Sequence, residues 1–172
     1  LPLCWEAIRK RHCPTPKFAV IGYGKLGGKE LGYVSDLDLV YLYDDPDPDA
    51  EENYARLGQR LNTWLSSQTS AGILFETDLR LRPNGDSGLL AVSVDSFRDY
   101  QLDKAWVWEH QALTRARFCA GDPAVGARFE EIRREILCRQ RNLAKLKEEV
   151  VAMRRKMYDA HASKSAILFD LK

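Results

Sequence analysis

Two apolar segments, 17–23 and 37–43, constrain the fold most, because they predict two buried strands joined by a short glycine-rich connection. The stretch between them reads IGYGKLGGKELG and contains the G-x-G-x-x-G pattern of dinucleotide-binding turns. A dinucleotide-binding unit needs a crossover helix of about a dozen residues before its next strand. Only 11 residues run from Lys25 to Ser35, and three of them are glycine. The sequence therefore argues against an NAD site and predicts a short helical piece near 25–31.

Two aspartates open the second predicted strand, in the sequence S-D-L-D-L. Side chains two residues apart in a strand point to the same side, so Asp36 and Asp38 stand side by side while Leu37 turns toward the core. Adjacent carboxylates repel each other unless a cation is present. Carboxylate oxygens suit Mg²⁺, which also keeps water and phosphate ligands. The pattern favours a magnesium site over an ordinary solvated strand entry.

The glycines before this strand support the same interpretation. Glycine-rich backbone at the start of a helix presents N–H groups to anions. A phosphate-binding turn followed about ten residues later by D-x-D combines a site for a triphosphate with a site for its metal ions.

A third carboxylate lies in the stretch ETDLRLRP, at the end of a strand predicted over 72–81. Glu76, Asp78, Arg80 and Arg82 share one face at a period of two. Asp78 is suited to bind a second metal ion or to accept a proton from an attacking hydroxyl. Arg80 or Arg82 is suited to bind triphosphate oxygens through forked donors. Taken alone, this stretch also fits the polar outer face of an antiparallel strand.

The rest of the pattern predicts an α+β fold whose second half is helical. The predicted elements are a helix over 1–13, a sheet core over 17–94 with a helix at 54–67 and a hairpin of 72–81 with 89–94, and helices over 95–120. In the helix predicted over 105–119, Trp108 is expected in the core. A catalytic domain is expected to end at 122, followed over 123–172 by long helices, interrupted near 139–142, that begin a helical-bundle domain.

Composition limits the partners and the compartment. The net charge of +1, from 26 basic and 25 acidic residues, does not indicate a general nucleic-acid-binding surface. No apolar run is long enough to span a membrane. The four cysteines lack C-x-x-C spacing and are expected to be free thiols in a reducing cytoplasm, and the three histidines are too far apart in sequence to suggest a metal site. The chain is expected to be a piece of a longer protein, since it does not begin with Met and ends in an apolar run.

Together, G-K-L-G-G, S-D-L-D-L and FETDLRLRP resemble the nucleotidyltransferases of the DNA polymerase beta superfamily. Residues 18–43, 72–92 and 97–122 are similar, more closely, to the glutamine synthetase adenylyltransferase/adenylyl-removing family. Its members carry two catalytic halves: one attaches AMP to a tyrosine of glutamine synthetase, and the other removes it by phosphorolysis. The stretch YQLDKAWVWEHQALTRAR at 100–117 is more like the C-terminal, adenylylating half.

The resemblance implies a polymerase beta-like fold, in which a mixed sheet is flanked by helices, and an Mg²⁺-dependent transfer of AMP from ATP. It implies that Asp36 and Asp38 bind Mg²⁺ and that Asp78 is the third carboxylate. It also implies a set of residues that line the phosphates: Gly24, Lys25, Gly27, Gly28 and Ser35. The implied partners are glutamine synthetase and, in the full-length enzyme, a PII signalling protein. Two alternatives stay open: the adenylyl-removing half, and a non-catalytic nucleotide-binding sensor module.

Overall fold

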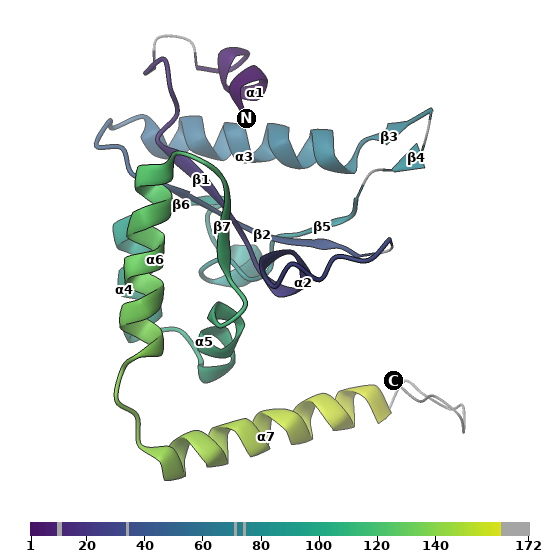
Figure 1. Ribbon diagram of the computed structural model, residues 1–172, viewed down its shortest axis with the longest axis vertical. Coiled ribbons are helices and arrows are strands. Elements are labelled where there is room, and N and C mark those ends of the chain that lie inside the picture. The colour runs from purple at the N-terminus through teal and green to yellow at the C-terminus, as the bar shows by residue number, and fades with distance from the viewer. Residues whose placement is uncertain (10–11, 34, 71, 74, 163–172) are drawn as a thin grey trace.

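A mixed five-stranded sheet forms the centre of the protein in the computed structural model, which describes residues 1–9, 12–33, 35–70, 72–73 and 75–162 (Figure 1). Its strands are β1 (Phe18–Gly22), β2 (Leu37–Tyr43), β5 (Thr77–Asp78), β6 (Ala91–Ser93) and β7 (Arg117–Gly121). β1 lies between β2 and β7 and is antiparallel to both. β5 and β6 follow one another along the other edge of β2, and both are parallel to it. The predicted α+β class and mixed sheet are confirmed.

The connection from β1 to β2 settles the topology. It contains one helical turn, α2 (Gly24–Gly27), and it returns the chain so that Phe18 lies opposite Tyr43. A dinucleotide-binding unit would instead make these strands parallel, through a full crossover helix. The pairing therefore excludes that unit here, as the short connection predicts.

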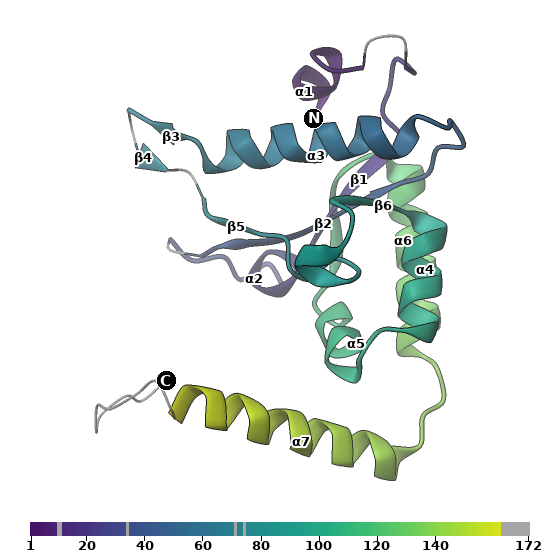
Figure 2. The ribbon, with the colours of Figure 1, turned by 180° about the vertical axis from the view of Figure 1, so that it is seen from behind.

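Helices cover both faces of the sheet (Figure 2). On one face lie α1 (Pro2–Glu6) and α3 (Ala50–Ser66), and on the other lie α4 (Val94–Asp103), α5 (Val107–Leu113) and α6 (Pro123–Leu137). The side chains of β2 alternate between the two cores: Leu39 and Tyr41 pack toward α3, whereas Val40 and Leu42 pack toward α4 and α6. β2 is therefore apolar on both faces, which explains its nearly continuous apolar sequence.

Local signals explain where two of these helices begin. The Ser93 hydroxyl accepts a hydrogen bond from the backbone N–H of Ser96 at the start of α4. The Asp122 carboxylate does the same for Ala124 at the start of α6, where Pro123 occupies the first helical position. Both are favoured helix starts, because the side-chain oxygen satisfies an N–H that has no acceptor within the helix.

The predicted strand over 72–81 and its hairpin with 89–94 are wrong. Gly72–Ile73 forms β4, which pairs with β3 (Gln68–Thr69), and 77–78 forms β5; Leu74 lies outside the described residues. β5 and β6 both pair with β2 rather than with each other. Between them the chain makes a compact loop in which Asn84 and Gly85 have positive φ angles of 61° and 54°, so an extended path past Pro83 is not possible.

The helices predicted over 1–13 and 95–120 are shorter than expected. α1 ends at Glu6, and the second segment breaks between α4 and α5 before 117–121 forms the edge strand β7. The backbone N–H and C=O groups along the outer edge of β1 require hydrogen-bond partners. Pairing with β7 supplies them, so 117–121 forms a strand and not the end of a helix. Trp108 is 38% exposed, so its predicted core position is wrong.

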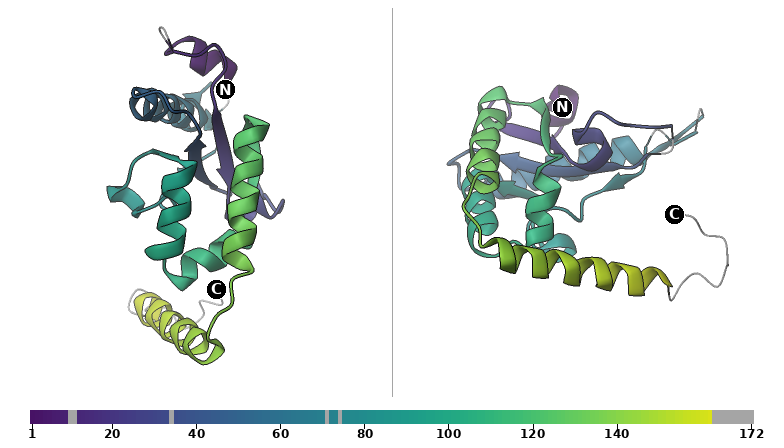
Figure 3. Two further views of the ribbon diagram at one scale, coloured as in Figure 1. Left: turned by 90° about the vertical axis from the view of Figure 1, so that its left-hand side faces the viewer. Right: turned by 60° about the horizontal axis from the view of Figure 1, so that its bottom comes forward.

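The second half divides at 138–142, as predicted, but its two helices differ in their surroundings (Figure 3). Phe129, Ile132 and Ile136 of α6 are buried in the same core as β1 and β2, so the packed unit runs past the boundary expected at 122. α7 (Leu143–Ala162) extends away from the sheet and contacts α5. No described helix is both long and apolar enough to cross a membrane.

Candidate active site

Three carboxylates meet where β2 begins. Asp36 precedes the strand, Asp38 is its second residue, and Asp78 of β5 lies opposite Asp38 in the parallel pair. One carboxylate oxygen of each residue lies within 4.8 Å of the others. The structure thus brings together the D-x-D pair and the third aspartate that sequence analysis selected, from segments 40 residues apart.

The charges of the three carboxylates are only partly balanced. Burial raises the pKa of Asp38, and the negative charges of Asp36 and Asp78 raise it further. The pKa of Asp78 is lowered, because Arg80 binds its carboxylate: Nε lies 3.0 Å from Oδ1 and 2.9 Å from Oδ2. A divalent cation would relieve the repulsion that Asp38 experiences. All three donors are hard oxygens, and such a set fits Mg²⁺.

The two arginines near Asp78 have different surroundings. The side chain of Arg80 is 73% exposed at the mouth of the site. The side chain of Arg82 is 11% exposed and turns into the loop, where Nη1 donates to the Leu79 carbonyl at 2.7 Å and lies 3.5 Å from Asp86. The strand ends at Asp78, so the period of two does not continue to Arg80 and Arg82, yet both arginines line one cleft with Asp36 and Asp78.

A cleft of about 540 Å³ opens beside the carboxylates. It is lined by Asp36, Glu76, Thr77, Asp78, Leu79, Arg80, Arg82, Asp86 and Leu90. The lining combines carboxylates with arginines, which suits a ligand that carries both phosphates and metal ions.

The glycine-rich turn approaches the carboxylates at Gly24. Its φ angle is +52°, which strains any residue with a side chain, and a Cβ atom there would overlap Oδ2 of Asp38. Lys25, which is exposed, follows it, and its charge acts to lower the pKa of Asp38. Gly24 and Lys25 therefore lie beside the predicted metal ligands.

The other predicted phosphate-lining residues are placed differently. Gly27 and Gly28 line a second cleft of about 410 Å³ with Arg115 and are absent from the lining of the first. A Cβ atom at Gly27 would overlap the Arg115 carbonyl, so glycine permits this close approach. Ser35 is 6% exposed, and its hydroxyl accepts a hydrogen bond from the Gly32 N–H at 3.0 Å. In this geometry these three residues shape the turn.

Comparison with known proteins identifies the family that shares this arrangement. Residues 4–132 match the sequence profile of the family described as glutamate-ammonia ligase adenylyltransferase. The chain belongs to this family. The match includes every element of the sheet and most of α6, and therefore the complete carboxylate cluster.

Relatives that align over most or all of the chain are described as bifunctional enzymes. They include the glutamine synthetase adenylyltransferase/adenylyl-removing enzymes of Aromatoleum aromaticum (69% identical over 172 residues), Nitrosomonas eutropha (60% over 172 residues) and Chromobacterium violaceum (62% over 157 residues). The alignments cover 100%, 100% and 91% of this chain, respectively. The chain spans 18% of the length of each of these relatives.

Two arginines from the segment 95–120, which sequence analysis predicted to be helical, hold the glycine-rich turn. Arg117 donates from Nε to the Gly27 carbonyl at 3.1 Å and from Nη2 to the Leu26 carbonyl at 3.0 Å. Arg115 lies 3.3 Å from the Gly24 carbonyl through Nε and 2.6 Å from Glu30 through Nη2. Sequence analysis missed this role because it predicted a helix at these positions. The segment 117–121 instead forms β7, which places Arg117 beside β1 and its turn.

Proposed function

We propose that this chain is an Mg²⁺-dependent nucleotidyltransferase domain that transfers AMP from ATP to a tyrosine hydroxyl of glutamine synthetase. The observation that carries the proposal is the convergence of Asp36, Asp38 and Asp78 within 4.8 Å beside a cleft lined by arginines. Family membership supports the acceptor, since the relatives are described as acting on glutamine synthetase.

In the proposed reaction, the tyrosine oxygen forms a bond to the α-phosphorus of ATP. The bond from that phosphorus to the pyrophosphate oxygen breaks, and the hydroxyl proton leaves to a base. Bound magnesium ions would polarise the phosphates and stabilise the entering and leaving oxygens. Asp36 and Asp38 would hold them, and the backbone at Gly24 would keep the nucleotide beside them.

The geometry favours one of the two roles open to Asp78. Its low pKa makes it a weak base but a good anionic ligand, because it stays ionised near neutral pH. Arg80, the exposed partner of Asp78, is free to turn toward a triphosphate once a metal ion takes its place at the carboxylate. We therefore assign Asp78 to metal binding and Arg80 to the phosphates.

The adenylyl-removing half is the second candidate. In that reaction, inorganic phosphate attacks the AMP-tyrosine bond and releases ADP, and it needs the same carboxylates. The stretch at 100–117 favours the adenylylating half by resemblance, and in the structure it supplies Arg115 and Arg117, which hold the glycine-rich turn. The sensor alternative is disfavoured, since a module that only binds nucleotide does not require three converging carboxylates.

The test uses ATP labelled at the α-phosphate, Mg²⁺ and unmodified glutamine synthetase. We expect label on a glutamine synthetase tyrosine with the parent chain and none with Asp36→Asn. Asp99→Asn, an exposed carboxylate on α4, is the matched control and should transfer label normally. A parallel assay follows ADP release from AMP-modified glutamine synthetase and phosphate. Activity only in the parallel assay would identify the removing half; undiminished transfer by Asp36→Asn would refute the carboxylate site.

Control by a PII protein and a cytoplasmic location stay predictions from the family and the composition.

A further inference from the structure

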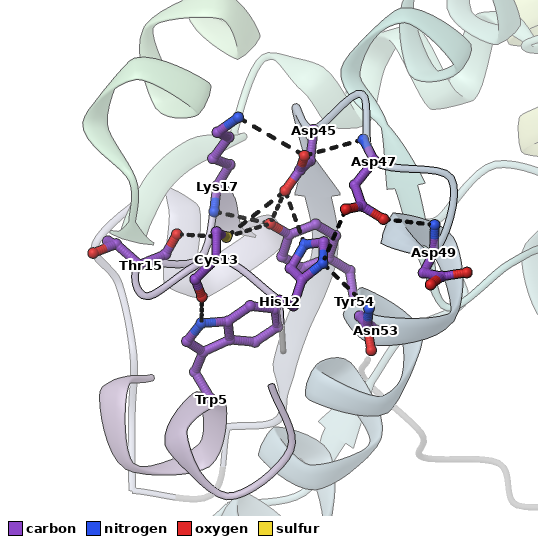
Figure 4. A network of polar contacts seen from close by, with 10 residues as sticks. All are labelled: Trp5, His12, Cys13, Thr15, Lys17, Asp45, Asp47, Asp49, Asn53 and Tyr54. Carbon is purple, nitrogen blue, oxygen red and sulfur yellow. Dashed lines mark hydrogen bonds and ion pairs between the residues drawn. The ribbon is translucent and has the colours of Figure 1, made fainter. Parts of the chain in front are cut away.

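A second polar cluster lies at the opposite end of β2 from the carboxylates. His12 and Cys13 come from the connection between α1 and β1, and Asp45 comes from the loop after β2 (Figure 4). Asp45 is seven residues beyond Asp38, so the two sites are about 23 Å apart along an extended strand. The proposed transferase reaction uses none of these three side chains.

The three donor atoms are arranged as for one small cation. Nε2 of His12 lies 3.0 Å from Oδ2 of Asp45, Sγ of Cys13 lies 3.8 Å from the same oxygen, and all three atoms are within 4.8 Å of one another. Donors that share a tetrahedral Zn²⁺ ion are about 3.3–3.6 Å apart, given bonds of about 2.0–2.3 Å. The His12–Asp45 and Cys13–Asp45 distances differ from these values by a few tenths of an ångström.

Further polar groups lie behind these donors. Nδ1 of His12 lies 3.4 Å from Nδ2 of Asn53 and 3.6 Å from Oδ2 of Asp47, a carboxylate just beyond hydrogen-bond distance. The Tyr54 hydroxyl donates to Oδ2 of Asp45 at 2.8 Å. A metal-bound histidine usually donates its second N–H to a carboxylate, and metal-bound carboxylates are themselves hydrogen-bonded. The side chains of His12 and Asp45 are 4% and 6% exposed, so water competes little for the site.

The surrounding core holds the cluster in place. Nε1 of Trp5 donates to the Cys13 carbonyl at 2.9 Å, and the Trp5 ring stacks on Tyr54 with 5.3 Å between ring centroids. The Lys17 N–H donates to the Tyr54 hydroxyl at 3.1 Å. These contacts fix the Cys13 backbone and the tyrosine independently of any ion, which lowers the ordering cost of binding one.

We propose that His12, Cys13 and Asp45 bind one Zn²⁺ ion, with a water molecule in the fourth position. The mixed nitrogen, sulfur and oxygen donors select zinc over magnesium, because a thiolate and an imidazole are poor ligands for Mg²⁺. On binding, Cys13 releases its thiol proton to solvent, and His12 binds through Nε2 with its ring proton on Nδ1, so that the hydrogen bond between Nε2 and Asp45 is replaced by bonds to the ion. The ion would link the connection between α1 and β1 to the loop after β2, away from the transferase site.

Cobalt(II), which reports zinc sites through its absorption spectrum, tests this directly. The chain, reduced and freed of metal, is titrated with Co²⁺ and then with Zn²⁺. We expect one equivalent of Co²⁺ to give a sulfur-to-cobalt charge-transfer band that Zn²⁺ removes. Cys13→Ser should lose the band, and Tyr54→Phe should weaken binding about 10-fold or more, as expected when a ligand loses its supporting hydrogen bond. Cys119→Ser, Cys138→Ser and Asp36→Asn should keep both the band and the affinity.

Circular dichroism establishes that each variant is folded before titration. If Cys13→Ser does not fold, Asp45→Asn provides the same comparison, with a weaker and spectrally altered cobalt complex expected. Absence of a saturable band in the folded parent would overturn the proposal and leave the cluster as a hydrogen-bonded support for α1. A band that persists in Cys13→Ser, or that disappears in Cys138→Ser, would also overturn it. Loss of AMP transfer in Asp36→Asn with an intact cobalt band would show that the two sites are independent.

Discussion

Asp38 is the residue at which function and stability are most clearly opposed. Without a cation it is partly buried beside two other carboxylates, and burial and those charges raise its pKa. We predict that Asp38→Asn stabilises the metal-free protein at pH 7 by an amount on the order of 1 kcal/mol, since it removes this repulsion. The same substitution should abolish Mg²⁺ binding. Urea unfolding in EDTA measures the first effect and calorimetry with Mg²⁺ the second.

The matched control is Asp99→Asn, which removes an exposed carboxylate from α4, a helix that contributes no residue to the lining of the cleft. It should change neither stability nor Mg²⁺ binding appreciably. If Asp38→Asn destabilised the metal-free protein instead, the carboxylate would have favourable partners that this account omits.

Gly24 gives a second prediction for a single residue. Its positive φ angle and its approach to Asp38 make Gly24→Ala unfavourable for two separate reasons. We expect a loss of stability of about 1–2 kcal/mol from backbone strain, together with weaker nucleotide binding. Gly85→Ala is the control, because Gly85 has a similar φ of +54° while an added Cβ there would lie 3.6 Å from its nearest neighbour, the Arg80 carbonyl oxygen. Equal nucleotide binding by the two variants, measured by calorimetry, would contradict a role for Gly24 beside the site.

At the scale of elements, sequence periodicity identified the strands of the centre but not the pairing at the edges. β1 and β2 are apolar on both faces, so their sequences carry a strong signal. β5 and β7 are short and half-exposed, and their place depends on hydrogen bonding to a neighbouring strand rather than on their own pattern. The segment at 117–121 has helical spacing, yet it pairs with the free edge of β1.

Asp45 bonds both to His12, from the connection after α1, and to Tyr54 of α3, and these contacts depend on its ionisation. Burial acts to raise its pKa, but hydrogen bonds from Tyr54, the Asp47 N–H and His12 outweigh burial and hold the pKa below its ordinary value. Because the folded-state pKa is the lower one, this stabilisation is fully present above the unfolded value of about 3.9 and is lost as pH falls through the folded value.

We therefore predict that Asp45→Asn lowers the free energy of unfolding by about 2 kcal/mol at pH 7, the scale of hydrogen bonds to a charged group. The difference from the parent should begin to shrink below about pH 4, where the Asp45 carboxylate of the unfolded parent becomes protonated, and should keep shrinking as pH falls toward the folded-state pKa. Urea unfolding of both proteins without added metal, between pH 3 and pH 7, checks this. The range extends about one unit below and three units above the unfolded pKa. A difference that stayed constant across this range would show that the charge of Asp45 contributes nothing.

At the scale of the whole molecule, the two last helices should contribute very differently to stability. Ile136 of α6 is fully buried, whereas Leu143 of α7 is 77% exposed. We expect Ile136→Ala to cost about 2–5 kcal/mol and Leu143→Ala less than about 0.5 kcal/mol. Thermal unfolding of the two variants makes the comparison. Similar losses would mean that the exposed face of α7 packs against another part of the chain or a second copy.

The candidate site shows what a sequence can and cannot reveal about a whole molecule. The three aspartates could be selected from the sequence, because carboxylates suit a metal ion and residues two apart in a strand share a face. The structure brings them together. The strand expected to set the phase of Arg82 ends at Asp78, so its side chain turns into the loop while still lining the cleft. The second cluster escaped detection because His12 and Asp45 meet only through the packing of α1 and α3 against the sheet.

The proposed nucleotide and metal site is tested most directly by calorimetric titration of the chain with a non-hydrolysable ATP analogue, with and without Mg²⁺, and separately with NAD. We predict binding of the analogue that requires Mg²⁺ and is lost in Asp36→Asn, and no heat from NAD. Binding of the analogue that is independent of Mg²⁺ and unchanged in Asp36→Asn, or tight binding of NAD, would contradict the assignment of the three aspartates.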